Sequence, residues 1–393
     1  MDFRDTPEEA AFRKDVREWL QASLPSGKRS PLFSTSTDRT EFLRDWQRRL
    51  YEGGWAGLSW PKEYGGRGAT LIEQVIFSQE AARAKAPAPL GVIGLGMAGP
   101  TIIAHGTDEQ KRRYLAKILS GEEIWCQGFS EPGSGSDLGS LKTSAVPDGD
   151  AYVINGQKVW TSYAHIADWC ILLARTDPAG PKHGGLTYFL MDMHAPGVEV
   201  RPLRQMSGDS QFNETFLTDV RVPAQNVLGQ VNDGWRVAMT TLLHERGTLG
   251  FALAVAARVG LDELIDHAKR TMLNGAPAIQ DPLIRQRIAQ FHEEVEANLL
   301  NNYRAISAMQ HTGIPGPEGS LSKLMFSETM QAIVRLALEI QGGWGLLEGA
   351  DAPDGGGWAY GHLRSRGYSI EAGTSEILRN IIAERVLGLP KHK

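Results

Sequence analysis

The spacing of apolar residues changes twice along this chain, and each change predicts a new kind of structure. Residues 1–123 carry apolar positions at helical spacing. Residues 124–232 contain short alternating segments that are separated by Gly, Pro, Asp and Asn. The helical period returns at residue 233 and holds to residue 393. The pattern therefore predicts an α+β multidomain protein, with an N-terminal all-helical domain (1–123), a middle β-barrel or sandwich (124–232) and a C-terminal helical domain (233–393).

Local signals place the N-terminal helices. Thr6, Pro7 and Glu9 together form the pattern of an N-cap, a first-turn proline and a capping box, so a helix is expected to begin there. The other predictions in this region are a loop over 27–40 and helices over 40–53 and 72–84.

The middle region is predicted to be built from short strands and tight turns. Asn155-Gly156 stands between two apolar segments and predicts a hairpin turn. The expected strands are 152–154, 159–161, 169–174, 187–191, 198–202 and 213–217. In the last region the expected helices are 233–258, 261–273, 282–311, 320–340 and one that begins near 374–375.

An apolar stretch at 91–99 carries four glycines, Gly91, Gly94, Gly96 and Gly99. Each glycine costs a helix about 1 kcal/mol relative to alanine, so something must offset that cost. One interpretation is close packing of two helices. The other is that the missing side chains leave room for a substrate chain.

Composition narrows the class of protein. The chain has 393 residues and a net charge of −5, with no basic block that would indicate a nucleic acid or an anionic membrane as a partner. We find no signal peptide and no apolar run of membrane-spanning length. Cys126 and Cys170 are too few for a disulfide framework or a zinc site, so no metal is expected. A soluble, cytoplasmic protein is predicted.

The richest candidate chemistry lies in residues 125–162. Pro132, Gly133 and Gly135 exclude a regular helix or strand, and the serines around them add hydroxyls and exposed backbone amides. Such a loop can surround a phosphate or the polar edge of a ring. A strand that carries Trp160 follows it. The pair suits a flat cofactor that bears phosphate, whereas a plain surface loop and hairpin are the alternative.

These residues, with others along the chain, resemble the acyl-CoA dehydrogenase family. The similar motifs are S-E-P-G-S-G-S-D (130–137), N-G-Q-K-V-W-T-S (155–162), W-P-K-E-Y-G-G-R-G (60–68), H-G-T-D-E-Q-K-R-R-Y-L (105–115), D-V-R-V-P-A-Q-N-V-L-G (219–229) and G-T-S-E-I (373–377). The resemblance covers almost the whole chain in order. It implies a four-helix bundle as the C-terminal domain and FAD between the β-domain and the C-terminal helices.

The resemblance also implies which residues bind FAD. The matching positions are Gln127, Phe129 and Ser130 at the ring, Ser136 at the pyrophosphate, Trp160 and Ser162 facing the ring, Thr374 and Glu376 at the far end, and Arg270, Glu339 and Gly343 toward a neighbouring subunit's flavin. Two of them depart from the family pattern. Glu339 stands where the family often has glutamine, and Arg270 stands in a segment with altered spacing and no phenylalanine.

The catalytic base is predicted from the same resemblance. Removal of a proton alpha to a thioester needs a carboxylate at the alpha carbon. Much of the family has a Glu directly before Gly-Thr-Ser, but here that residue is Ala372. Isovaleryl- and long-chain-type members carry the base on an earlier helix before an arginine, which matches Glu245-Arg246. We therefore expect Glu245 to be the base, Glu371 the fallback, Arg246 to shape the electrostatics, and the backbone N–H of Ala372 to meet the thioester oxygen. A structural ion pair of Glu245 is the alternative.

The implied function is α,β-dehydrogenation of an acyl-CoA to a trans-2-enoyl-CoA, as in beta-oxidation of fatty acids. Electrons would pass to an electron-transfer flavoprotein, and the assembly would be a homotetramer or a two-plus-two heterotetramer. Ala372, Gly247 and the glycines at 91–99 indicate a roomy pocket for a branched, long or cyclic acyl chain. Two alternatives stay open: a non-catalytic partner subunit of a heterotetramer, and a flavin oxidase or monooxygenase of the same fold.

Overall fold

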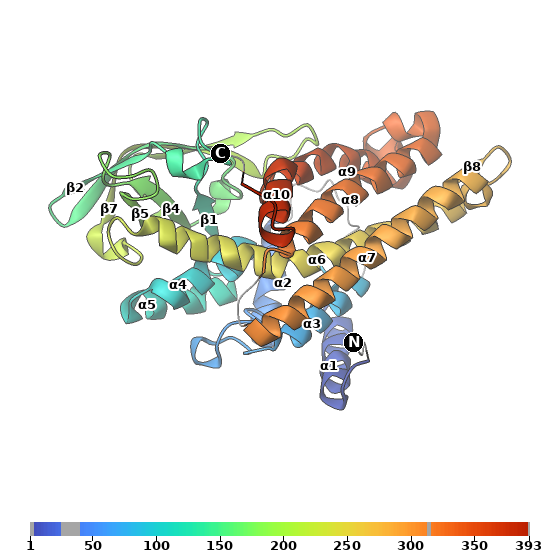
Figure 1. Cartoon of the computed structure of the whole chain (residues 1–393), viewed down its shortest axis with the longest axis horizontal. Helices are drawn as coiled ribbons and strands as arrows, with labels where there is room; N and C mark the ends of the chain where they lie inside the picture. The colour runs from blue at the N-terminus through green and yellow to red at the C-terminus, as the bar shows by residue number, and fades with distance from the viewer. Residues whose placement is uncertain (1–3, 25–39, 313–315, 392–393) are drawn as a thin grey trace. The chain divides into compact units, whose positions relative to one another are not determined.

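A computed structural model describes residues 4–24, 40–312 and 316–391 of the chain (Figure 1). The side chains of residues 245–249, 312 and 350 lie outside this description. The chain divides into two compact units. The bundle unit comprises Met1–Ser36, Ala69–Pro87 and Arg246–Lys393, and the sheet unit comprises Thr37–Gly68 and Ala88–Glu245.

The order of elements is helical, then β, then helical, as the spacing of apolar residues predicted. The first helices are α1 (Pro7–Ser23), α2 (Thr40–Glu52), α3 (Leu71–Arg83), α4 (Gly99–His105) and α5 (Asp108–Ser120). The strands that follow are β1 (Trp125–Gly128), β2 (Ser144–Asp148), β3 (Ala151–Lys158), β4 (Trp169–Arg175), β5 (Leu186–Asp192), β6 (Val198–Leu203) and β7 (Phe212–Pro223). The last helices are α6 (Gly234–Arg270), α7 (Pro282–Thr312), α8 (Gly319–Gln341), α9 (Gly357–Ser365) and α10 (Ser375–Ile381), with a short hairpin of β8 (Met272–Leu273) and β9 (Ala276–Pro277) between α6 and α7.

The sheet unit contains one seven-stranded sheet in the order β1-β4-β2-β3-β7-β6, with β5 paired to β4. Strand β4 pairs in parallel with β1 and β2, and the other pairs are antiparallel. Helix α5 packs against the sheet through Tyr114, whose ring lies edge-on to Trp125 of β1 (5.3 Å) and Trp169 of β4 (4.9 Å). The sheet therefore has an aromatic anchor at the strand that leads into the predicted cofactor loop.

The hairpin turn predicted at Asn155-Gly156 is wrong. Strand β3 runs through both residues, and its register against β7 shifts between Ile154 and Gly156, which marks a bulge. The turn instead lies between Asp148 and Ala151, which are paired across the hairpin. Gly156 is needed for packing, because a Cβ there would lie 2.4 Å from Thr143 Oγ1. Residues 159–161, predicted as a strand, follow the end of β3 without strand structure.

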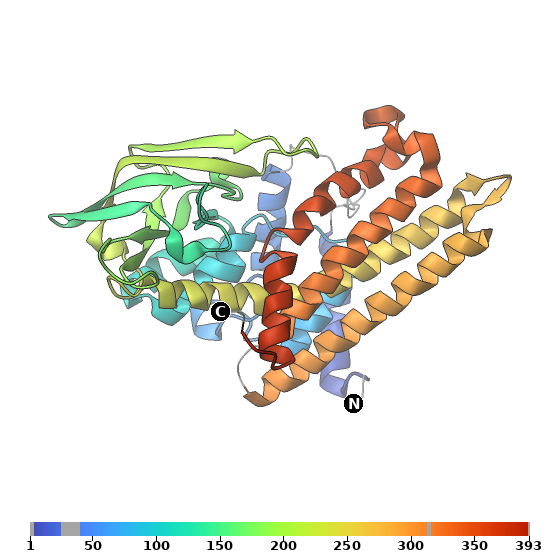
Figure 2. The ribbon, with the colours of Figure 1, turned by 45° about the horizontal axis from the view of Figure 1, so that its top comes forward.

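The bundle unit packs its long helices around one apolar core. Figure 2 shows α7 and α8 side by side, and residues of α6, α7, α8 and α9 share the core. The two helices predicted at 233–258 and 261–273 form the single helix α6. Thr6 and Glu9 form the capping box at the start of α1, which confirms that prediction. The loop predicted at 27–40 lies outside the described residues except for Thr40, which begins α2.

Charge holds α1 to α3 within the bundle unit. The carboxylate of Glu80, which is buried, accepts hydrogen bonds from Arg13 (3.1 Å), from Arg17 (2.9 and 3.1 Å) and from Arg83 (2.8 Å). Burial raises the pKa of Glu80, but these guanidinium groups outweigh that effect and hold it below its ordinary value. Two arginines of α1 therefore converge on one carboxylate of α3, in addition to the buried apolar face of α1.

Candidate functional site

The predicted site residues fall into two groups, one in each unit. The sheet unit holds Gln127, Phe129, Ser130, Ser136, Trp160, Ser162 and the end of its part of α6, Glu245. The bundle unit holds Arg246, Arg270, Glu339, Gly343, Glu371, Ala372, Thr374 and Glu376.

In the sheet unit, the loop after β1 is fixed to the end of β3. The backbone N–H of Val159 donates to the carbonyl of Ser130 (2.9 Å). Glu131 and Ser134 exchange backbone hydrogen bonds of 2.9 and 3.0 Å across a tight turn. The structure thus brings Phe129 and Ser130 together with the segment that carries Trp160.

Two residues that the sequence did not single out, Lys158 and Glu131, hold this loop in place. Lys158, the last residue of β3, is 1% exposed and donates to the Phe129 carbonyl (3.1 Å) and to Glu131 Oε1 (2.9 Å). Glu131 also accepts the backbone N–H groups of Lys142 (2.7 Å) and Thr143 (2.8 Å). Both residues stand within the quoted motifs, but nothing in a motif shows that a lysine is buried. The available signal was a charged residue in an alternating strand next to an apolar segment.

The pKa values of this pair move in the same direction for different reasons. Burial lowers the pKa of Lys158, against the opposing effect of Glu131. Burial raises the pKa of Glu131, but the charge of Lys158 and the hydrogen bonds from Thr143 and Lys142 bring it below its ordinary value. Glu131 is therefore a buried carboxylate in its ionised form.

The loop after β1 and the segment after β3 carry three serine hydroxyls for which the described residues provide no hydrogen-bond partner. Within the described part of the chain, the hydroxyls of Ser130, Ser136 and Ser162 make no hydrogen bond. A Cβ at Gly133 or Gly135 would meet no atom within 4 Å, so space is open beside the loop. Hydroxyl donors around open space can bind an anionic or polar group.

Trp160, which follows the end of β3 and precedes Ser162, has most of its side chain in solvent. Its side chain is 60% exposed, and the ring meets Phe212 edge-on at 6.1 Å. Its backbone has φ 60°, which is rare for a bulky residue. Hydrogen bonds between Thr161 and Asn213 of β7 hold the segment (3.0 and 2.9 Å). A fixed, exposed aromatic ring is suited to stacking on a planar ligand.

The bundle unit presents a second group between α9 and α10. Ala372 has φ 52°, and within the described residues its backbone N–H donates to no acceptor. Lys323, which is buried, donates to the carbonyls of Tyr368 (2.5 Å) and Gly373 (2.8 Å). Thr374 caps α10 by accepting the N–H of Ile377 (3.2 Å). Glu376 is exposed in the first turn, where the helix dipole favours its charge.

Glu371, the fallback base, forms an ion pair with Arg364 of the same unit. Arg364 donates to both of its carboxylate oxygens, at 2.9 and 3.1 Å. The guanidinium of Arg364 also lies 5.1 Å from the ring of Tyr368. Protonation of Glu371 would break this ion pair.

Three further predicted residues of the bundle unit are arranged differently. Glu339 pairs with Arg287 of α7. Arg270 is 68% exposed and lies 3.9 Å from Asp354. A Cβ on Gly343 would meet no atom within 4 Å. The two residues that depart from the family pattern therefore have oppositely charged partners in their own chain.

The backbone of α6 is continuous through the predicted base, but the side chains of Glu245 and Arg246 lie outside the description. One turn earlier, Thr241 is buried and bonds to Tyr188 (3.0 Å) and Thr101 (3.0 Å). Along the same helix, Ala238 is buried and Ala252 is exposed.

The four glycines of 91–99 differ in their surroundings. Residues Gly94–Ala98 form a π-helical turn. A Cβ would lie 2.8 Å from Gln47 at Gly91, 3.0 Å from Ile118 at Gly94 and 1.9 Å from Trp60 at Gly99. At Gly96 it would meet no atom within 4 Å. Close packing therefore explains Gly91, Gly94 and Gly99, whereas Gly96 borders open space.

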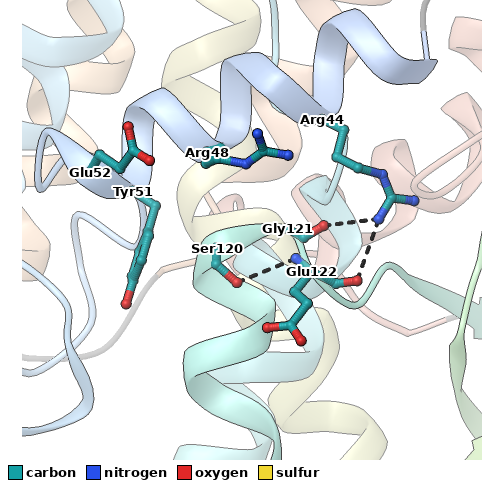
Figure 3. Close-up of a pocket in the computed structure, with 7 residues that line it drawn as sticks. All are labelled: Arg44, Arg48, Tyr51, Glu52, Ser120, Gly121 and Glu122. Atoms are coloured by element: carbon teal, nitrogen blue, oxygen red, sulfur yellow. Dashed lines mark hydrogen bonds between the residues drawn. The ribbon is translucent and has the colours of Figure 1, made fainter.

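A separate hollow of about 430 Å³ lies between α2 and α5 of the sheet unit (Figure 3). Arg44 spans one side of it and donates to the carbonyls of Gly121 (3.2 Å) and Glu122 (3.4 Å). None of the predicted site residues lines it. Among the described residues, no three His, Cys, Asp or Glu side chains are grouped to hold a metal, and no helix is long and apolar enough to cross a membrane.

Three family models match the chain in sequence order. They are described as acyl-CoA dehydrogenase N-terminal domain (residues 6–122), middle domain (126–220) and C-terminal domain (232–387).

Individual proteins match over nearly the whole length. A protein named acyl-CoA dehydrogenase IpdE1 from Mycobacterium tuberculosis is 42% identical over 390 residues, which are 97% of each chain. A structure titled Tcur3481-Tcur3483 steroid ACAD has a TM-score of 0.86 at 31% identity, and the ChsE4-ChsE5 complex from Mycobacterium tuberculosis has 0.84 at 32%, each over 100% of both chains.

Proposed function

The chain belongs to the acyl-CoA dehydrogenase family, whose members are FAD-dependent oxidoreductases, and we propose that it dehydrogenates a CoA thioester with a polycyclic, steroid-type acyl group. The three family models and the full-length relatives support the reaction class. The open space at Gly96 carries the proposal for the acyl group. The full-length likeness to a structure titled a steroid ACAD points the same way.

The residues of the sheet unit fit FAD. The hydroxyls of Ser130, Ser136 and Ser162, which bond to none of the described residues, supply donors for phosphate and for the polar edge of a ring. The exposed ring of Trp160 supplies a planar surface. We propose Gln127 and Phe129 beside the ring, and Thr374 and Glu376 at the far end. When bound, FAD accepts the hydride that leaves the beta carbon of the substrate.

Glu245 is proposed as the base that removes the alpha proton. It lies on α6 four residues after the buried Thr241, so a helix fixed by hydrogen bonds positions it. The N–H of Ala372, which meets no acceptor among the residues that the structure describes, would donate to the thioester oxygen and stabilise charge that develops there. Arg246 would adjust the electrostatic field at the base. Loss of a proton and a hydride from adjacent carbons gives a trans-2-enoyl-CoA.

The size of the acyl group is proposed from two positions, Gly96 and Ala372, that carry no side chain or only a small one. Gly96 leaves space on the π-helical turn, and Ala372 has only a methyl group where much of the family has a glutamate. A rigid ring system needs such space because it cannot fold into a narrow channel. Unbranched short acyl chains would leave this space unfilled.

A partner chain of different sequence is also proposed. Glu339 and Arg270 match positions that reach a neighbouring subunit's flavin, yet Glu339 pairs with Arg287, and Arg270 lies near Asp354. A carboxylate at that position would repel a pyrophosphate, so a second copy of this chain is a poor donor. The structures titled ChsE4-ChsE5 complex and Tcur3481-Tcur3483 each name two components. We therefore favour a two-plus-two heterotetramer over a homotetramer. Electron-transfer flavoprotein as the acceptor and a cytoplasmic location stay predictions.

The first experiment records the visible spectrum of the purified protein and adds a panel of acyl-CoA thioesters without oxygen. Bleaching of a yellow protein, fastest with a polycyclic acyl-CoA, is the expected result. Preference for short unbranched chains would overturn the acyl proposal. A colourless protein would indicate the non-catalytic partner subunit, and rapid reoxidation by oxygen would indicate an oxidase.

A further inference from the structure

We propose that Lys158 is a positioning residue for FAD, because it ties the loop at Phe129–Glu131 to the end of β3. This inference rests on the proposed place of Phe129 and Ser130 beside the flavin ring. It goes beyond that place by naming the group that fixes them there. Lys158 itself is buried and is not offered as a contact of the cofactor.

The tether has two arms. The Nζ of Lys158 lies 3.1 Å from the Phe129 carbonyl and 2.9 Å from Glu131 Oε1, so it bridges both sides of Ser130. Val159, the next residue, adds the backbone bond to the Ser130 carbonyl (2.9 Å). Three consecutive loop residues are thus held by two consecutive residues of one strand end.

Both charged groups of the tether are enclosed. Lys158 is 1% exposed and Glu131 is 9% exposed. A buried ion pair of this kind adds little net stability, because the attraction only offsets the cost of taking both charges out of water. Leucine or methionine would fill the space at lower cost. What the pair provides is a fixed geometry, since each charge must keep its partner.

That geometry bears directly on the cofactor surface. Phe129 is buried and its ring meets Tyr188 of β5 edge-on at 5.8 Å, so packing as well as the tether positions this part of the loop. The Ser130 hydroxyl, for which the described residues provide no partner, is then presented from a fixed backbone. Donors that are fixed before binding lose less entropy when the ligand arrives, so the tether should raise FAD affinity.

The same loop provides a matched control. Lys182 pairs with Asp137 at 2.7 Å, and both side chains are more than half exposed (54% and 59%). Lys182→Met and Lys158→Met therefore remove the same charge from ion pairs of the same loop. Only Lys158→Met removes a hydrogen bond to the carbonyl of Phe129.

The experiment measures FAD binding to the full chain in the oligomer in which it purifies, after removal of the flavin. K158M should raise the dissociation constant for FAD at least about tenfold relative to K182M, and it should shift the visible absorption band of the bound flavin. Because K158M leaves Glu131 unpaired, the double variant E131Q/K158M is measured beside it. It should fold and still bind FAD weakly.

Equal FAD affinity in E131Q/K158M and K182M would overturn the proposal, and so would an unchanged absorption band. Failure of both Lys158 variants to fold would also overturn it, since the pair would then serve folding alone. The readout does not involve an acyl-CoA. Wild-type protein that binds FAD but is bleached by no polycyclic acyl-CoA would contradict the proposed substrate and leave this inference intact.

Discussion

Arg364 and Glu371 form an ion pair in which one guanidinium nitrogen lies 2.9 Å and 3.1 Å from the two carboxylate oxygens. Glu371 precedes Ala372, which occupies the position of the catalytic glutamate in much of the family. A carboxylate that must break an ion pair to accept a proton is a poor base. The pair therefore favours Glu245 over Glu371.

We predict that Glu245→Gln lowers the rate of anaerobic flavin bleaching by about 10³-fold, because a general base contributes roughly 10² to 10⁴. The isosteric amide should leave FAD bound, which the visible spectrum reports. Glu371→Gln is the matched control and should keep the bleaching rate within about threefold, well below the contribution of a base. Full activity in E245Q, or loss of activity only in E371Q, would exchange the two roles.

Gly96→Leu should narrow the proposed acyl site without disturbing the fold, since a Cβ at Gly96 meets no atom within 4 Å. The ratio of kcat/KM for a polycyclic acyl-CoA over that for a short linear one should fall at least about tenfold, as expected for filling an apolar pocket. Gly94→Ala serves as the control, because its Cβ would press on Ile118 at 3.0 Å. It should lower stability and leave the ratio unchanged. An unaltered ratio in G96L would place the acyl group elsewhere.

Glu80→Gln should destabilise the bundle unit by about 3 kcal/mol, because it leaves three guanidinium groups around a position that has lost its charge. Urea unfolding followed by circular dichroism measures the change. Glu109→Gln, at an exposed ion pair with Arg112, should leave the urea midpoint unchanged. If both variants unfold at the wild-type midpoint, the Glu80 cluster adds no net stability to the bundle unit.

His267 should make the protein less stable in mild acid. Its side chain is 3% exposed and lies 3.2 Å from Asp354, and Arg270 is also close. Burial lowers the pKa of His267, although Asp354 opposes the shift. The unfolded chain, with a pKa of about 6.5, therefore binds the proton more readily. Stability is complete above about pH 6.5 and falls as the pH drops toward the pKa of the folded state.

The test for His267 compares free energies of unfolding near pH 7.5 and near pH 5.5, on either side of the ordinary histidine pKa of about 6.5. His267→Gln should lose less stability than the wild type between these values, because it has no proton to take up. His105 and His165, whose pKa values burial also lowers, contribute in the same direction and remain in both proteins. An identical loss in both proteins would show that His267 does not titrate in this range.

The sequence was most informative where the signal is local. Thr6 and Glu9 bond to each other across one helical turn, so three residues were enough to place the start of α1. Asn155-Gly156 misled for a physical reason. Asn155 bonds to Asp219 of β7 in both directions (3.0 and 2.9 Å), and Gly156 makes room for Thr143. Both requirements come from other strands, which a local turn pattern cannot show.

The sequence indicated a candidate cofactor loop and the segment that carries Trp160, although that segment is not a strand, and it did not indicate the residues that support them. The S-E-P-G-S-G-S-D and N-G-Q-K-V-W-T-S segments indicated a cofactor site, and the structure joins them through Val159 and Ser130. The sequence does not show that the Lys158 side chain is buried, and the structure does. The same holds for Gly96, since four glycines in one stretch look alike until each is measured against its neighbours.

The chain's two cysteines lie opposite each other on the parallel strands β1 and β4, and neither is accessible to solvent. Thiol reagents will therefore react only with molecules whose sheet has opened. The rate at which the thiols are modified therefore measures how often the sheet unit opens, without an introduced label. Since the bundle unit contains no cysteine, its separate unfolding would not change the rate of thiol modification.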